Sequence, residues 1–184
     1  MKKVNWGSIT ASKDGSFERL PAGPYVVHIV SAEDNELKEY VNIVWDICEG
    51  EWAGHYSDDW GKEHPYAHNL VLSYRTEKAL SMTKGRLEVI QECNPGFDPF
   101  AAIDAGRLDM LVGRKFVANL QEEEYEGNDG KVKTRLNVSQ VRTIADLREG
   151  KVKTPKKKTL DGREDDAAIA AEASSLTPDI EIPF

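Results

Sequence analysis

Runs of β-branched and aromatic residues predict three strands in the first third of the chain. The first covers residues 25–30 and follows a turn rich in proline and glycine. The second covers residues 40–48, where apolar and other side chains alternate, and this alternation directs Trp45 into the core. A third strand is expected at residues 55–60, whereas residues 61–75 show no clear pattern.

A different period follows and predicts helices. Between residues 76 and 93 the apolar side chains fall on about half the circumference of a helix, and an Asn-Pro-Gly sequence ends it. A shorter helix is expected at residues 98–106, because Asp98 can cap its N-terminus, Pro99 suits the first turn and Gly106 suits the end.

Two further strands, at residues 115–120 and 131–144, are joined by a turn rich in glycine and asparagine. Five strands with a helix between the third and the fourth are the plan of an OB-fold, a small closed barrel. The predicted fold is therefore mainly β: a five-stranded OB-fold barrel with a helical insertion between strands 3 and 4 and a disordered C-terminal tail. A β-sandwich with a helical excursion gives a similar pattern.

Charge is distributed unevenly and divides the chain into blocks. The net charge is −8; residues 1–150 contribute −7, residues 151–163 contribute +5 and residues 164–184 contribute −6. With the hydrophobic pattern, these blocks predict four parts. They are a loosely ordered arm at 1–17, the OB-fold domain at 18–148, a basic, extended linker at 149–163 and an acidic disordered tail at 164–184.

Several classes of protein are disfavoured. We find no apolar run long enough for a membrane span or a secretory signal. Cys48 and Cys93 lie in apolar surroundings, which favours reduced thiols in a cytosolic protein over a disulfide. The sequence contains no Gly-x-Ser-x-Gly, phosphate-binding loop or dinucleotide motif, so we expect neither an enzyme nor a bound cofactor.

The order of short motifs in the body is similar to that of a phage-encoded family, formerly of unknown function, whose members are assigned as OB-fold single-stranded DNA-binding proteins. The resemblance covers roughly residues 18–145. The motifs are Leu20-Pro21-Ala22-Gly23-Pro24-Tyr25, Ile47-Cys48-Glu49-Gly50-Glu51-Trp52-Ala53-Gly54, Leu111-Val112-Gly113-Arg114-Lys115-Phe116 and Glu124-Tyr125-Glu126-Gly127-Asn128-Asp129-Gly130-Lys131. The acidic body and the His-rich segment at 55–75 depart from the family, which puts in doubt which surface holds DNA.

The last six residues resemble the C-terminal tip of single-stranded DNA-binding proteins. They are Asp179, Ile180, Glu181, Ile182, Pro183 and Phe184. In that family the tip recruits replication and repair proteins: the terminal ring fills an apolar pocket and the carboxylates meet basic residues at its rim. Together the two resemblances imply a phage protein of DNA replication, recombination or repair in the cytoplasm of the infected bacterium. The sequence does not give its oligomeric state and leaves a homo-oligomer open. The acidic tail would compete with DNA for the basic surface.

Holding single strands requires aromatic faces for the bases and cations for the phosphates. Aromatic residues cluster in and after the second and third predicted strands, and cations accompany them there and in the last two strands. The candidate DNA-binding residues are Tyr40, Trp52, Tyr56, Trp60, Lys62, Tyr74, Arg75, Arg114, Lys115, Tyr125, Lys131, Lys133 and Arg135. Each side chain could instead belong to the core or to a solvated face of the barrel.

Two other functions stay open. The negative charge of the body favours an acidic protein-interaction module or DNA mimic that binds a host factor and no nucleic acid. His55, His64 and His68 lie within one short acidic segment and could hold the metal of a nuclease. However, Pro65 disfavours a helical conformation at His64, and no third ligand has a diagnostic spacing, so we expect no metal.

Overall fold

The computed structural model describes residues 19–160. The N-terminal arm predicted at 1–17, the acidic tail predicted at 164–184 and the partner-binding tip therefore lie outside the described residues.

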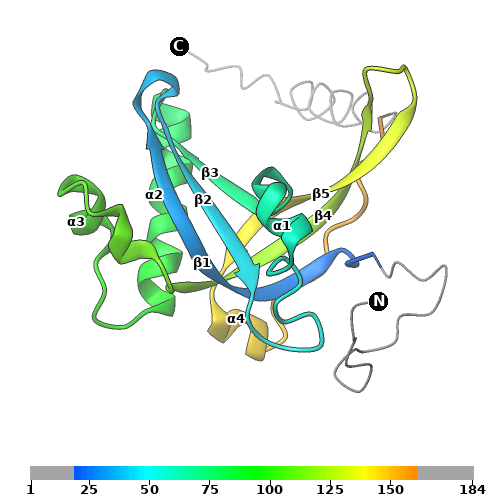
Figure 1. Ribbon diagram of the computed structural model, residues 1–184. Helices are drawn as coiled ribbons and strands as arrows, with labels where there is room; N and C mark the ends of the chain where they lie inside the picture. The colour runs from blue at the N-terminus through cyan, green and yellow to red at the C-terminus, as the bar shows by residue number, and fades with distance from the viewer. Residues whose placement is uncertain (1–18, 161–184) are drawn as a thin grey trace, which may run out of the picture.

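A five-stranded antiparallel sheet forms the centre of the domain (Figure 1). Its strands are β1 (Gly23–Asn35), β2 (Tyr40–Ile47), β3 (Asn69–Ser73), β4 (Lys115–Glu126) and β5 (Val132–Arg142), in the order β3-β2-β1-β4-β5. The long strand β1 joins the two halves of the sheet. Its first residues, Gly23 to His28, pair with β4, and its later residues, Val27 to Asn35, pair with β2.

Helices connect the strands and cover the core. They are the 3-10 turns η2 (Glu36–Lys38), η3 (Pro65–His68) and η4 (Leu108–Leu111) and the α-helices α1 (Asp59–Glu63), α2 (Glu77–Cys93), α3 (Pro99–Asp104) and α4 (Ile144–Arg148). The helical insertion predicted between the third and fourth strands is confirmed by α2 and α3. Asp98 caps α3, as expected, and Thr76 caps α2 by accepting from the N–H of Ala79.

The predicted third strand at residues 55–60 is wrong. Asp58 accepts a hydrogen bond from the backbone N–H of Gly61 and so begins helix α1 within that range. The third strand is instead the five-residue β3, in which Leu70 and Leu72 are buried. This strand lies in the segment whose pattern is unclear from the sequence.

The predicted closure into a barrel is also wrong, because β3 and β5 are the two edges of an open sheet. On β3 the carbonyl oxygen of Ser73 accepts from the Thr83 hydroxyl at 2.7 Å, and that of Val71 accepts from Arg86 at 2.8 Å. Both donors belong to α2, so side chains of a helix satisfy edge carbonyls that a neighbouring strand would otherwise use. The turn η3 contacts β5 across the gap.

The core lies on one face of the sheet, beneath α2 and η4. Trp45 is 1% exposed, which confirms its predicted place in the core, and Val27, Ile29, Ile43 and Phe116 are fully buried with it. The opposite face, which we call the outer face, carries the side chains between these positions on each strand. Within residues 19–160, no helix has the length and apolar character needed to cross a membrane.

Candidate nucleic-acid interface

A groove of about 810 Å³ lies on the outer face, where the chain between β2 and β3 folds over β1 and β2. We call it the β1–β2 groove. The strands contribute His28, Val30, Val44, Asp46 and Cys48 to its lining, and the connection contributes Tyr56, Lys62, Pro65 and His68. The groove is thus largely apolar, with a few polar groups that could orient a ligand.

One side of the groove is fixed by a ladder of buried rings, Trp45–Tyr56–His68. The Tyr56 and His68 rings stack with their centroids 4.3 Å apart, and Trp45 meets both rings edge-on. The Asp46 carboxylate accepts from the backbone N–H of Tyr56 at 3.0 Å. Burial, together with the charges of Asp46 and Tyr25, raises the pKa of Tyr56 to about 12.

His68 ties the end of the connection to the sheet and to α1. One ring nitrogen contacts the carbonyl oxygen of Trp45, and the other lies 3.0 Å from that of Gly61. Gly61 is itself buried, and a Cβ atom at this position would lie 2.1 Å from the carbonyl oxygen of Tyr56. The backbone of α1 therefore approaches the ring ladder more closely than any other residue would allow.

A second ladder, Trp60–His64–Tyr66, faces solvent and alternates along the chain with residues 61, 62 and 65, which line the groove. The Trp60 and His64 rings stack with centroids 4.5 Å apart, and Tyr66 meets His64 edge-on at 5.6 Å. Trp60 is 52% exposed and Tyr66 is 70% exposed. Lys62 projects from the same helix and forms an exposed 3.8 Å ion pair with Asp59. The segment of α1 and η3 therefore presents exposed aromatic rings and a lysine side chain close together.

The β4–β5 hairpin brings together a second group of the predicted residues. Tyr125 lies opposite Lys133, and the Arg135 guanidinium lies 5.1 Å from the Tyr125 ring centroid. Lys133 pairs with Asp129 at 3.2 Å and Arg135 pairs with Glu123 at 3.0 Å, so nearby carboxylates neutralise both cations. Lys131 precedes β5, in the turn.

Other predicted residues lie apart from the groove or are engaged elsewhere. Trp52 is half-buried, and its indole N–H donates to Glu51 at 3.1 Å. Lys115 pairs with Glu49 at 3.2 Å, and Arg114 packs over the Phe97 ring.

Tyr40, Tyr74 and Arg75 lie at the end of the sheet formed by the start of β2 and the end of β3. Their neighbours there are acidic: the Tyr74 hydroxyl donates to the carboxylate of Asp34 at 2.9 Å. The structure therefore does not bring these three residues together with the groove.

The basic linker predicted at residues 149–163 is anchored to the sheet in its described part. Residues 151–158, which we call the basic strap, run beside β4 (Figure 1). Asn119 and Gln121 on the outer face of β4 donate to the carbonyl oxygens of Lys153 and Lys156, at 2.9 and 2.7 Å. Lys158 then pairs with β4 through two backbone hydrogen bonds of 2.8 Å, beyond the point where β1 begins.

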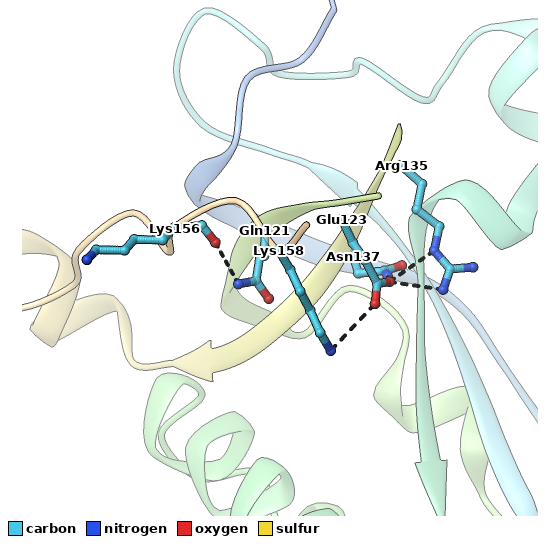
Figure 2. A network of polar contacts seen from close by, with 6 residues as sticks. All are labelled: Gln121, Glu123, Arg135, Asn137, Lys156 and Lys158. Carbon is cyan, nitrogen blue, oxygen red and sulfur yellow. Dashed lines mark hydrogen bonds and ion pairs between the residues drawn. The ribbon is translucent and has the colours of Figure 1, made fainter. Parts of the chain in front are cut away.

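The lysines of the strap are not equivalent. Lys157 forms a 2.8 Å ion pair with Glu124, and Lys158 lies 3.7 Å from the buried carboxylate of Glu123. Figure 2 shows that Glu123 also accepts from Arg135 and Asn137, whereas the Lys156 side chain points away from this network. Lys153 and Lys156 are exposed and have no ion pair within residues 19–160.

The groove and the strap lie on the same face of the sheet. His28 is directly opposite both Asp46 on β2 and Lys115 on β4, and directly opposed side chains share a face. Asn119 and Gln121 follow Lys115 at even spacing along β4 and so share that face as well. The groove, with Lys62 in its lining, and the strap therefore share one surface.

The three histidines of the metal alternative do not converge. Both ring nitrogens of His68 contact carbonyl oxygens, and Nδ1 of His64 lies 2.8 Å from the carbonyl oxygen of Trp60. His55 packs edge-on against Trp52 and Tyr56 instead. Across residues 19–160, no three His, Cys, Asp or Glu side chains are grouped so that they could hold a metal ion.

Sequence reasoning missed two parts of this surface. His28 lines the groove, and its buried Nδ1 has no hydrogen-bond partner in the described part of the chain. Its place between the core residues Val27 and Ile29 is the signal that could have identified it. No sequence signal separates the strap lysines that form ion pairs from those that do not, because the position of the strap along β4 decides which lysines meet carboxylates. Comparison with protein-family models and with curated proteins found no match.

Proposed function

We propose that this chain is a phage single-stranded DNA-binding protein built on an OB-fold that is opened between β3 and β5. The strand order supports this fold, since β1 pairs with both β2 and β4 as in that five-stranded, partly open barrel. Helix α2 also lies at the expected point of the chain, between the third and fourth strands.

The exposed Trp60 and Tyr66 rings beside the β1–β2 groove carry the proposal. Base stacking on an aromatic side chain contributes about 1–3 kcal/mol per base and does not depend on sequence. Two rings of high exposure, held by a helix and a turn that the buried ladder anchors, provide such a platform.

Phosphates would be held by Lys62 at the rim and by Lys153 and Lys156 of the strap. These lysines border the outer face, and the two on the strap have no carboxylate partner in the described residues. Because only these few lysines serve the proposed interface, we expect modest affinity with a shallow dependence on salt.

The resemblance of the last six residues to the family tip supports recruitment of replication, recombination or repair proteins through Phe184. The acidic residues upstream would compete with DNA for the strap. On this proposal the protein acts in the cytoplasm of the infected bacterium, without a cofactor and without catalysis.

Titration of labelled oligo-dT, followed by fluorescence anisotropy at low salt, tests the proposal. We expect binding that rising salt reverses and that Trp60→Ala and Tyr66→Ala each weaken about tenfold. Met82→Ala removes a side chain of equal exposure, 53%, from α2 and should have no effect. Absence of binding to the wild-type protein at low salt would contradict the proposal.

One observation favours the second candidate, an acidic interaction module or DNA mimic that binds a host factor. Four of the seven cations in the predicted DNA site, Lys62, Lys115, Lys133 and Arg135, are paired with carboxylates. A domain in which cations are neutralised in this way attracts nucleic acid weakly. The same titration separates the two candidates, because a DNA mimic would leave oligo-dT unbound at every salt concentration.

A further inference from the structure

A second groove, of about 730 Å³, lies away from the proposed DNA interface. It is enclosed by the end of the β1–β2 hairpin, β3, α2 and α3, and we call it the α2–α3 groove. Its floor is the core itself, where Val41, Leu72 and Leu87 reach the surface of the groove. Phe100 and Ile103 of α3 form one wall.

Apolar side chains continue from this groove onto the surface. Leu80 on α2 lines the groove and is 52% exposed, and Tyr74 lines it with 37% exposed. Leu37, next to the lining residue Glu36, is 99% exposed. Exposed apolar side chains that line a concave site are typical of a place where another molecule binds.

The rim of this groove is acidic. Asp34, Glu36 and Asp104 line it, and none of them forms an ion pair within residues 19–160, while Lys84 is paired with Glu88 at 3.8 Å. The hydrogen bond that Tyr74 donates to Asp34 raises the pKa of Tyr74, and burial and the negative charge of these neighbours act in the same direction. The groove therefore combines an apolar floor with uncompensated negative charge.

We propose that the α2–α3 groove is a docking site for an amphipathic segment of a partner protein that presents apolar side chains flanked by lysines or arginines. The apolar floor requires apolar side chains, and the three rim carboxylates favour cations around them. The same carboxylates repel the phosphates of DNA and also the chain's own acidic tip at residues 179–184.

The position of the groove has a functional consequence. The proposed DNA interface uses the outer face of β1, β2 and β4, whereas this groove opens among α2, α3 and the β1–β2 turn. A partner could therefore occupy the α2–α3 groove while DNA occupies the other site. This inference does not depend on DNA binding.

A labelled synthetic peptide of alternating Leu-Leu and Lys-Lys pairs is a direct probe, with the same peptide carrying Glu for Lys as its control. Fluorescence anisotropy with the full-length protein should show binding of the lysine peptide alone. Leu80→Lys should weaken that binding at least about tenfold. Met82→Lys, on the same helix with equal exposure but outside the groove, should weaken it less than about twofold.

The contrast between the two variants decides the question, because both add one positive charge to an exposed position of α2. Equal effects of Leu80→Lys and Met82→Lys, binding of the glutamate peptide, or no binding of the lysine peptide would each overturn the proposal. So would a dimer in sedimentation that Leu80→Lys dissociates, which would assign the groove to a second copy. Tighter peptide binding after deletion of residues 1–18 would assign it to the chain's own N-terminal segment.

Discussion

The segment between β2 and β3 contributes to two ladders of three aromatic rings each, which differ almost only in exposure. Trp45, Tyr56 and His68 are at most 7% exposed and stack against the sheet. Trp60 and Tyr66, with His64 between them, are more than half exposed, on the segment whose other residues line the groove. The same residue types thus serve as packing in one place and as a binding surface in the other.

The difference in exposure between the two ladders arises from how the backbone is held and not from the types of ring. The buried ladder is fixed by hydrogen bonds from Asp46 and His68 to the main chain and by the close approach of Gly61 to Tyr56. The exposed ladder projects from the helix and turn that these contacts hold. We therefore expect changes in the first ladder to alter stability and changes in the second to alter ligand binding alone.

The largest effect is expected from Trp45→Ala. Removing this fully buried ring should lower the free energy of unfolding by about 3–5 kcal/mol, because it leaves a cavity in the core. Trp60→Ala, the matched change in the exposed ladder, should change it by less than about 0.5 kcal/mol. Urea denaturation measures both, and similar losses from the two variants would erase the distinction between the ladders.

Gly61→Ala should lower the free energy of unfolding by about 2–3 kcal/mol, since the new Cβ would collide with the carbonyl of Tyr56. Gly85→Ala is the control: this glycine lies within α2, and its added Cβ would meet nothing within 4 Å. That variant should be up to about 1 kcal/mol more stable than wild type. Thermal denaturation of the pair measures how tightly α1 is held.

Alkaline pH should destabilise the buried ladder. The pKa of Tyr56 is about 12 in the folded protein and near 10 in the unfolded chain, so folding favours the neutral ring. The stability from this group is complete below pH 10 and is lost as the pH rises toward 12, by about 2 kcal/mol. Urea denaturation of wild type and Tyr56→Phe across this range should show the extra loss in wild type only.

The smallest effect concerns the basic strap. Lys156→Ala should weaken oligo-dT binding by less than about 1 kcal/mol and reduce the slope of log affinity against log salt by about 1, because it removes a free cation. Lys157→Ala should leave that slope unchanged, since Glu122 and Glu124 already engage Lys157. Equal slopes for both variants would show that the ion pairs of the strap do not persist in solution.

Much of the fold could be predicted from local patterns. The alternation in β2 placed Trp45 in the core, the apolar period predicted α2, and Asp98 marked the start of α3 because a cap acts on the residues that follow it. The error at residues 55–60 has the same origin: Asp58 caps a helix, and Gly61 allows the close approach that lets it pack. Tyr56 and Trp60 are spaced as on one face of a strand, and this spacing hid the helix signals of Asp58 and Gly61.

What could not be predicted depends on distant partners. Thr83 and Arg86 of α2 bond to carbonyl oxygens at the open edge of β3, and no periodicity in the sequence reveals these contacts. The candidate site was predicted in part: Tyr56 and Lys62 line the groove, whereas Tyr74 lies among carboxylates at another end of the sheet. To predict that carboxylates neutralise Lys133 and Arg135, one would have needed the register of β4 against β5.

The double pairing of β1 has a consequence for the speed of folding. The β1–β2 and β4–β5 hairpins each join strands that only a short turn separates, so either half can start to form early. The ladder between Gly23–His28 and Lys115–Leu120 instead closes a loop that contains most of the domain. We expect the docking of these two preformed halves to be the slow step of folding.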